Sequence, residues 1–538
     1  MNTKRFLLVM TVLLLALSAC AAPAAPTQVS TAPIAVTTTR SQPPATTRPQ
    51  PTQAALPAVS ASPSNRLPAP TQAAAQADVP LPNPAPGDNT FQDYGVNPIV
   101  DTRKDHLSTF ALDVDTASYT VARRYVNDGS LPPFDAVRAE EFINYFDQGY
   151  ANPPGVGFAV YADGALAPFE MGGRYVLRFG VQGYSVPDEE RKPANLVFVV
   201  DTSGSMGNEN RLELVKQSLN LLVDRLHPTD TVAIVHFGTV AGVVLDPTPG
   251  SDKATIRHAI RWMTPSGSTN AEQGLELGYN LALKAYQPEG INRVILCSDG
   301  VANTGLTDPD AILSRIHGYI SEGVTLTTVG FGMGNFNDVL MEQMADKGDG
   351  QYFYVDTLEE AGRIFVDKIT GTLQVIAKDA KVQVDFNPDV VSHYRLIGYE
   401  NRAIADQDFR NDSVDAGEIG AGISATALYV VDLRPNVEGR LATVQLRWKD
   451  PDGEQTHEIN GNVNTWDLSS SFEEADPRYQ LAVAAGEYAE ILRQSPYASM
   501  SSLDGLSTCT RRLAETLRSD PDVVEFAGLV ERASQIGE

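Results

Sequence analysis

Cysteine and histidine are scarce in this chain. Only three cysteines occur in 538 residues, and beyond Cys20 there remain Cys297 and Cys509. Neither of these two has a neighbour at metal-ligand or redox spacing, and the seven histidines show no zinc spacing. The shortage excludes a disulfide framework and a zinc site of the usual kind. We expect Cys297 and Cys509 to be free thiols, and a disulfide between them is the less favoured alternative.

Positive charge is also in short supply. The chain has 41 Lys and Arg residues against 67 Asp and Glu residues, which gives a formal net charge of −26. A surface of this kind repels nucleic acid and anionic lipid, so we expect no nucleic-acid partner. It is compatible with cations or basic partners, although strong acidity often serves solubility alone.

An apolar run near the start of the chain determines its predicted compartment. Two basic residues precede the run Phe6–Leu17, which is too short for a comfortable membrane span and is typical of a secretory signal. The sequence Leu-Ser-Ala-Cys that ends at Cys20 resembles a bacterial lipobox. We therefore predict a signal peptide at residues 1–19 and a lipid on Cys20. The lipid would anchor the chain to the cell membrane or outer envelope, facing outside the cytoplasm. An ordinary signal peptide without lipidation is the alternative.

Changes in composition divide the rest of the chain. Residues 20–90 are rich in Ala, Pro, Thr, Gln and Ser, which predicts a disordered stalk behind the lipidated cysteine. Strands alternate with helices over residues 191–375, which predicts an α/β domain with a mainly parallel sheet and helices on both faces. The flanking segments are an α+β region at 91–190, a β-rich region at 376–470 and a helical segment at 471–538.

The α/β segment is predicted element by element. The strands Thr231–Phe237 and Val240–Leu245 form a hairpin through Gly238-Thr239, which places one antiparallel strand at the edge of the sheet. The predicted strands are Leu196–Val200, Thr231–Phe237, Val240–Leu245, Arg293–Cys297, Thr325–Gly330 and Gln351–Val355. The predicted helices are Leu212–Leu226, Asp252–Met263, Asn270–Ala285, Pro309–Glu322, Asn337–Lys347 and Leu358–Gln374.

The β-rich pieces on both sides of the α/β segment leave two arrangements open. Strands from residues 157–183 could complete the sheet that begins after residue 377, in which case the α/β segment is an insertion in a sandwich. Separate flanking domains are the alternative.

Oxygen-bearing side chains follow two buried strands and precede one helix. Asp201, Ser203 and Ser205 stand at alternate positions after the first strand, Thr269 lies just before a helix, and Asp299 follows a second buried strand. The carboxyl ends of parallel strands form the edge of a sheet where ligands bind. Carboxylates and hydroxyls there suit a hard divalent cation. Each motif alone also describes an ordinary helix cap or turn, but the three in this order favour a metal site.

These three motifs resemble the metal-ion-dependent adhesion site of von Willebrand factor type A domains, and the resemblance covers Asn195–Gln374. It implies hydroxyl ligands at Ser203, Ser205 and Thr269, with Asp201 and Asp299 coordinating directly or through water. The implied cation is Mg²⁺, with Mn²⁺ or Ca²⁺ as alternatives. The implied partner is a protein that supplies a Glu or Asp carboxylate to the metal.

The flanks carry a narrower resemblance. The order of lipobox, Thr/Pro-rich stalk, residues 110–119, type A domain and Glu418–Gly422 resembles a family of bacterial von Willebrand-domain lipoproteins. We therefore expect a membrane-anchored module that binds protein through a divalent metal and is not an enzyme. A structural envelope-assembly protein, whose metal only stabilises the fold, is the first alternative. A metal-dependent hydrolase is disfavoured because no histidine is placed as a base and Ser203 lacks a Gly-x-Ser-x-Gly elbow.

Two other motifs are given structural roles. Asp113 and Asp115 could suggest a second cation site, but their spacing is not that of an EF-hand, and we expect Asp115 to cap the helix that follows. The glycine-rich stretch Gly330–Gly334 follows a strand late in the sheet, so we expect a flexible rim loop near the metal face rather than a dinucleotide loop.

Overall fold

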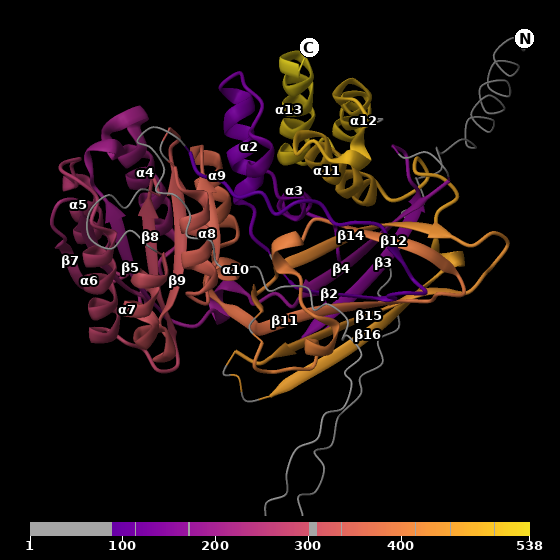
Figure 1. Cartoon of the computed structure of the whole chain (residues 1–538). Helices are drawn as coiled ribbons and strands as arrows, with labels where there is room; N and C mark the ends of the chain where they lie inside the picture. The colour runs from indigo at the N-terminus through magenta and orange to yellow at the C-terminus, as the bar shows by residue number, and fades with distance from the viewer. Residues whose placement is uncertain are drawn as a thin grey trace, which may run out of the picture. The chain divides into compact units, whose positions relative to one another are not determined.

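The structure is a computed structural model of the whole chain. It describes residues 89–537 except 113, 156, 170–172, 301–308, 335, 415, 452, 454 and 500. The predicted signal peptide 1–19, the predicted lipidation site Cys20, nearly all of the predicted stalk 20–90, and Asp113 lie outside the described residues. All described residues fall in one structural unit, Pro33–Glu538 (Figure 1).

A six-stranded sheet forms the centre of the α/β part of the described chain. The strand order is β10–β9–β8–β5–β6–β7, and neighbours are parallel except for β6 and β7. The central strand β5 is buried along its whole length, as its unbroken apolar sequence predicts for a strand covered on both faces. The bounds are β5 Ala194–Asp201, β6 Thr231–Phe237, β7 Gly242–Pro249, β8 Ile291–Ser298, β9 Thr325–Phe331 and β10 Tyr352–Val355.

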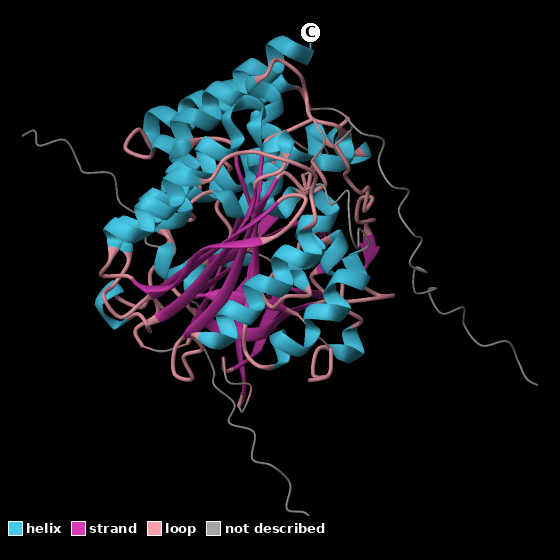
Figure 2. Ribbon diagram, turned by 90° about the vertical axis from the view of Figure 1, so that its left-hand side faces the viewer, coloured by secondary structure: helices cyan, strands magenta, loops and turns pink. Residues whose placement is uncertain are grey.

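Helices cover both faces of this sheet (Figure 2). Successive residues of a strand point to opposite faces, so Phe198 packs in a core with Leu212 of α4, whereas Val199 packs in another core with Leu275 of α6. Each such buried apolar side chain contributes about 1.5–3 kcal/mol. The bounds are α4 Arg211–Arg225, α5 Lys253–Trp262, α6 Ala271–Lys284, α7 Pro309–Ser321, α8 Asp338–Asp346 and α9 Leu358–Gly362.

Two antiparallel sheets pack face to face beside the α/β part and enclose their own apolar core. One has the order β1–β12–β14–β4–β3, and the other has the order β13–β11–β15–β16 with β2 also paired to β11. The bounds are β1 Val100–Asp101, β2 Leu107–Ala111, β3 Phe158–Leu166, β4 Tyr175–Gly183, β11 Val375–Phe386, β12 Val391–Ile397, β13 Gly417–Gly420, β14 Ser424–Leu433, β15 Arg440–Lys449 and β16 Thr456–Asn464.

Pairing between β4 and β14 decides how the parts are connected. Phe179 of β4 lies opposite Ala427 of β14, and the whole α/β segment lies between these two strands in the sequence. Of the two arrangements that the sequence allows, the structure adopts the insertion. Both ends of the α/β segment therefore join the same sandwich.

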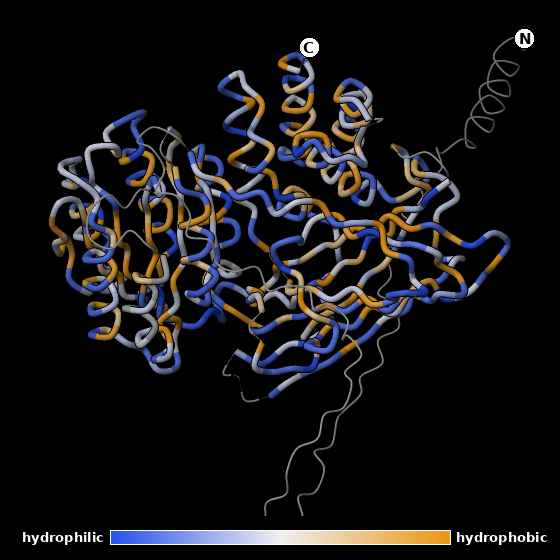
Figure 3. Tube along the Cα trace, viewed as in Figure 1, coloured by the Kyte–Doolittle hydropathy of each residue, from blue (hydrophilic) through white to orange (hydrophobic). Residues whose placement is uncertain are grey.

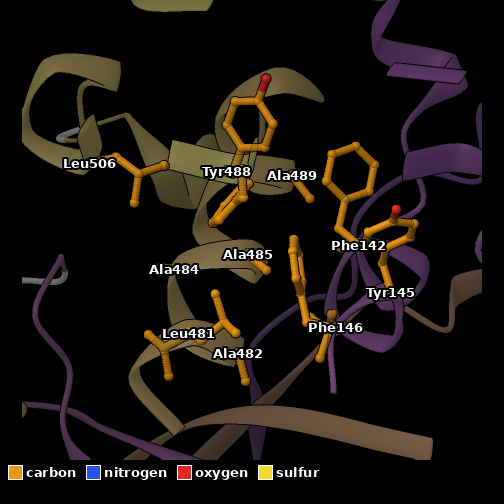
Figure 4. Packing of buried hydrophobic residues seen from close by; sticks show 14 of the residues in the cluster. Phe142, Tyr145, Phe146, Leu481, Ala482, Ala484, Ala485, Tyr488, Ala489 and Leu506 are labelled. Atoms are coloured by element: carbon orange, nitrogen blue, oxygen red, sulfur yellow. The ribbon is translucent and has the colours of Figure 1, made fainter. Parts of the chain in front are cut away.

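The helices near the end of the chain pack on two helices from its first described part. Figure 4 shows Tyr488 of α11 beside Phe142 of α3, and their ring centroids lie 5.9 Å apart. This cluster also includes Leu506 of α12 and Phe526 of α13, and the apolar stretches that supply it are orange in Figure 3. The bounds are α2 Ala117–Asn127, α3 Ala139–Tyr145, α11 Pro477–Leu492, α12 Leu503–Thr516 and α13 Pro521–Gly537. Among the described residues, no helix has the length and apolarity needed to cross a membrane.

Several local expectations differ from the structure. The predicted helix Leu358–Gln374 is interrupted after α9 by a π-helical turn at Arg363–Asp367, and a short helix α10 (Ile369–Leu373) follows. The guanidinium of Arg363 lies 3.7 Å from the ring centroid of Tyr145 and donates a hydrogen bond to its carbonyl, which holds the chain where the helix is broken. Strand β7 extends from 242 to 249, past the predicted Val240–Leu245.

The predicted cap by Asp115 is wrong. Its carboxylate accepts a hydrogen bond from the Tyr352 N–H at 3.0 Å, because the polypeptide before α2 runs beside strand β10. The start of α2 is instead served by Glu141, whose carboxylate accepts the Ser118 N–H at 2.8 Å. Cys297 and Cys509 are free thiols, as expected.

Candidate metal centre

Asp201 ends the central strand β5 and is completely buried. Its two carboxylate oxygens have different donors: Oδ1 accepts the Ser203 N–H at 2.8 Å, and Oδ2 accepts the Ser298 hydroxyl at 2.8 Å. Because Ser298 ends the neighbouring parallel strand β8, this contact joins the carboxyl ends of two strands. The carboxylate is thus held in one orientation by its own loop and by the next strand.

The hydroxyls of Ser203 and Ser205 lie together in the turn after Asp201, with their Oγ atoms 3.0 Å apart. Ser203 is buried, and the Ser205 side chain lies at the more open side of the turn. The turn continues into a short 3₁₀ segment, Gly204–Asn210, that leads into α4. Two hydroxyl oxygens are therefore presented next to the oriented Asp201 carboxylate.

Thr269 is buried in the loop between α5 and α6, and that loop is hydrogen-bonded to the turn after β5. The Ser266 N–H donates to the Thr202 carbonyl at 2.6 Å, and the Gly204 N–H donates to the Gly267 carbonyl at 2.9 Å. Gly267 has a φ of +81°, and a Cβ there would lie 2.2 Å from Thr239 Oγ1. Only glycine fits this close approach, which fixes the path of the loop toward Thr269.

Asp299 follows β8 directly and is completely buried. The Arg211 guanidinium, from the first turn of α4, donates to Asp299 Oδ2 at 3.0 Å and to the Met333 carbonyl. The predicted rim loop makes room for this side chain, since a Cβ on Gly332 would lie 2.2 Å from Arg211 Nε. Asp201 and Asp299 thus meet at one edge of the sheet, with an arginine beside the second carboxylate.

Arg211 and Ser298 are the residues of this site that the sequence motifs missed. Ser298 stands beside Asp299 in the sequence and is identified only when β5 and β8 are known to be neighbours. The position of Arg211 is a sequence signal, because a positive side chain in the first turn of a helix is unfavourable beside the positive end of the helix dipole. It indicates that an anion lies nearby. Nothing in the sequence indicates which anion that is.

The electrostatics of the site favour a bound cation. Burial, followed by the negative charge of Asp299, raises the pKa of Asp201 to about 7. Two buried carboxylates and three hydroxyls offer only oxygen ligands, and this donor set fits Mg²⁺, Mn²⁺ or Ca²⁺ rather than a soft metal. Within the described residues, no three His, Cys, Asp or Glu side chains gather into a metal-binding group. A site with two carboxylates and three hydroxyls does not require one.

Three family models match successive parts of the chain. The von Willebrand factor type A domain matches residues 195–367, the family described as von Willebrand factor matches 85–176, and the family described as Uncharacterized protein YfbK, C-terminal, matches 371–536. The first of these contains all five candidate ligands. Type A domains often hold a divalent metal, so the match agrees with the donor set described above.

Individual proteins and structures are similar over longer stretches. The Uncharacterized protein sll0103 of Synechocystis sp. (strain ATCC 27184 / PCC 6803 / Kazusa) is 26% identical over 291 residues, which are 52% of this chain and 67% of that protein. The solved structure of von Willebrand factor type A from Catenulispora acidiphila has a TM-score of 0.41 and 15% identity, and the match covers 70% of this chain and 90% of that one.

A higher identity over most of the chain is found in Escherichia coli (strain K12). Its Uncharacterized protein YfbK is 38% identical over 445 residues, which are 78% of this chain and 76% of that protein. The chain belongs to the YfbK family of bacterial proteins, and its inserted α/β part is a von Willebrand factor type A domain.

Proposed function

We propose that this chain is an extracytoplasmic, lipid-anchored module that binds a protein partner through a divalent cation, Mg²⁺ in the first place. Asp201, Ser203, Ser205, Thr269 and Asp299 would hold the cation. The observation that carries the proposal is the convergence of three separate loops on one strand edge, where the buried Asp201 carboxylate is oriented by Ser203 and Ser298. A bound cation would supply an electrophile to which a Glu or Asp carboxylate of a partner binds.

The proposal does not include catalysis. The Ser203 and Ser205 hydroxyls contact each other, and the ring of His236 lies against Thr202, with its Nδ1 3.3 Å from Thr202 Oγ1. Neither serine is therefore arranged with this histidine as a nucleophile with its base.

A second candidate is a structural envelope-assembly role in which the metal only stabilises the fold. One observation favours it: buried ion pairs join the α/β domain to its flanks. Arg123 of α2 contacts Asp356 and Glu360 at 2.6 and 3.0 Å, and Arg138 contacts Asp338 of α8 at 2.6 Å. A domain held in this way suits a rigid scaffold as well as a binding module.

Titration calorimetry of the full chain tests the metal site. Mg²⁺ or Mn²⁺ should bind the wild type, and Asp201→Ala should abolish the binding. Asp246→Ala removes a carboxylate from the exposed strand β7, where the Asp246 side chain is 73% exposed, and it should leave binding unchanged. Absence of a binding heat at millimolar metal in the wild type would contradict the site.

Partner capture separates the two candidate functions. The tagged chain is incubated with envelope extract, with and without EDTA, beside the Asp299→Ala variant. A metal-bridged partner should be lost from the wild type in EDTA and from the Asp299→Ala variant without EDTA. A partner that is retained under both, while EDTA lowers the melting temperature of the wild type, would support the structural role instead.

A further inference from the structure

Helix α5 carries a basic surface on a strongly acidic protein. The helix contains Lys253, Arg257, His258 and Arg261 and no Asp or Glu, whereas the chain as a whole has a net charge of −26. Its apolar side, with Ile256, Ala259 and Ile260, is buried against the sheet. The charged side chains therefore lie on the side that faces solvent.

Trp262 ends this helix and is 69% exposed. Its ring lies beside that of His258, with 5.9 Å between the ring centroids. A large exposed aromatic side chain is costly to leave in water and is enriched where proteins bind one another. The same helix therefore offers an apolar contact next to its positive charges.

The exposed side of α5 is connected to the candidate metal centre through the loop that follows the helix. The chain runs from Trp262 through buried Met263 into the loop that carries Thr269, and this loop is hydrogen-bonded to the turn after Asp201 through Ser266 and Gly267. On the other side of the loop, Val240 is 64% exposed, and its neighbour Thr239 accepts the Ser268 N–H at 3.1 Å. Trp262 thus ends the helix that leads into the Thr269 loop, and Val240 belongs to the β6–β7 connection that is hydrogen-bonded to this loop.

We infer that His258, Arg261, Trp262 and Val240, which we call the α5 surface, dock an acidic segment of a protein partner. The inference rests on the proposed function and names the kind of segment that the site accepts. One carboxylate of the segment would reach the metal, a second would pair with Arg261, and an apolar side chain between them would cover Trp262. Arg257 and Lys253 are engaged with the side chain and carbonyl of Asp224, so Arg261 is the charge that the helix offers outward, with the His258 ring beside Trp262.

A protein segment fits this surface better than an anionic membrane does. The basic side of α5 covers a single helix, and the net acidic charge of the chain would be repelled by an extended anionic layer. A short acidic segment meets only the basic helix. Complementary charge of this kind mainly speeds and orients association, while the buried aromatic contact supplies affinity.

Selection of random displayed peptides on the immobilised full chain in Mg²⁺ tests the inference. Retained peptides should combine Asp or Glu with a large apolar residue. Their retention should fall about tenfold or more on the Trp262→Ala and Arg261→Glu chains. Two matched controls should retain them fully: Trp466→Ala, which removes a tryptophan that is 68% exposed on the sandwich, and Arg518→Glu, which reverses an exposed arginine after α12.

The outcomes distinguish this surface from the metal centre itself. Acidic peptides that survive EDTA but are lost on Arg261→Glu would support the α5 surface while contradicting the metal-bridged function. A normal Mg²⁺ binding heat without enrichment of acidic peptides would overturn the α5 surface and leave the metal centre standing. Binding of the full chain to phosphatidylglycerol vesicles that is lost on Trp262→Ala and Arg261→Glu would overturn it in favour of a membrane.

Discussion

Two groups of buried carboxylates in the type A domain have different surroundings. At the junction with α2, Glu360 contacts both Arg123 at 3.0 Å and Arg363 at 3.2 Å. Although burial opposes it, Arg363 and Arg123 hold the pKa of Glu360 below its usual value. At the metal centre, burial and Asp299 raise the pKa of Asp201 to about 7.

This difference separates a structural group from a binding group. At the junction Asp356 and Glu360 form ion pairs with Arg123 that fix one domain against its neighbours, although burial raises the pKa of Asp356. At the candidate metal centre Arg211 pairs with Asp299, whereas Asp201 accepts hydrogen bonds from the neutral Ser203 N–H and Ser298 hydroxyl and lies near the like charge of Asp299. A cation from outside would therefore improve the surroundings of Asp201. A buried carboxylate held in an ion pair points to a structural role, whereas a buried carboxylate beside a second carboxylate, such as Asp201, points to a ligand.

Of the changes considered, removal of Arg123 at the junction should have the largest effect, and it should act on the free energy of unfolding. Arg123→Leu leaves the buried Asp356 without its guanidinium partner and Glu360 with Arg363 alone, which should lower the free energy of unfolding by about 3–5 kcal/mol. Urea denaturation followed by circular dichroism measures the change. Arg124→Leu is the matched control, because Arg124 is the next residue on α2, is 28% exposed and pairs with Asp128. It should cost about 0.5 kcal/mol or less. Equal losses in the two variants would contradict a structural role for the junction.

The sequence motifs named residues that the structure brings to one edge of the sheet, but they did not indicate the junction, for a physical reason. The apolar strands before Asp201 and Asp299 are local patterns, and the parallel topology brings their ends to one edge. Arg123 of α2 contacts Asp356 and Glu525, which lie 233 and 402 positions further along the chain. No local sequence pattern records pairs that are so far apart. The insertion of the α/β segment in the sandwich follows from the pairing of β4 with β14, which are also far apart in the sequence. The sequence therefore left two arrangements open.

Removal of Arg211 at the candidate metal centre should have the next largest effect, and it should act on the affinity for Mg²⁺. Its guanidinium pairs with Asp299 at 3.0 Å, so a metal cation would have to share that carboxylate with a positive charge. Arg211→Gln should raise the affinity for Mg²⁺ about tenfold, or ~1.4 kcal/mol, because like-charge repulsion is removed. Titration calorimetry of the full chain measures it. Arg225→Gln, at the exposed far end of the same helix, is the control. A weaker Mg²⁺ affinity in Arg211→Gln would show instead that Arg211 positions Asp299 for the metal.

Acid should weaken the junction through Glu360, with a smaller effect than the removal of Arg123. Since the pKa of Glu360 is lower in the folded chain than its ordinary value of 4.5, the unfolded chain binds its proton first as the pH falls. The stability that Glu360 contributes is complete above about pH 4.5 and is lost as the pH falls toward the folded pKa. Urea midpoints measured from neutral pH down to about pH 3 should therefore decline less steeply in Glu360→Gln than in the wild type. Glu213→Gln, whose carboxylate is 59% exposed on α4, should keep the slope of the wild type. A slope in Glu360→Gln as steep as in the wild type would mean that the acid sensitivity arises elsewhere, and the contrast between the two groups of carboxylates would then lose its support from pH.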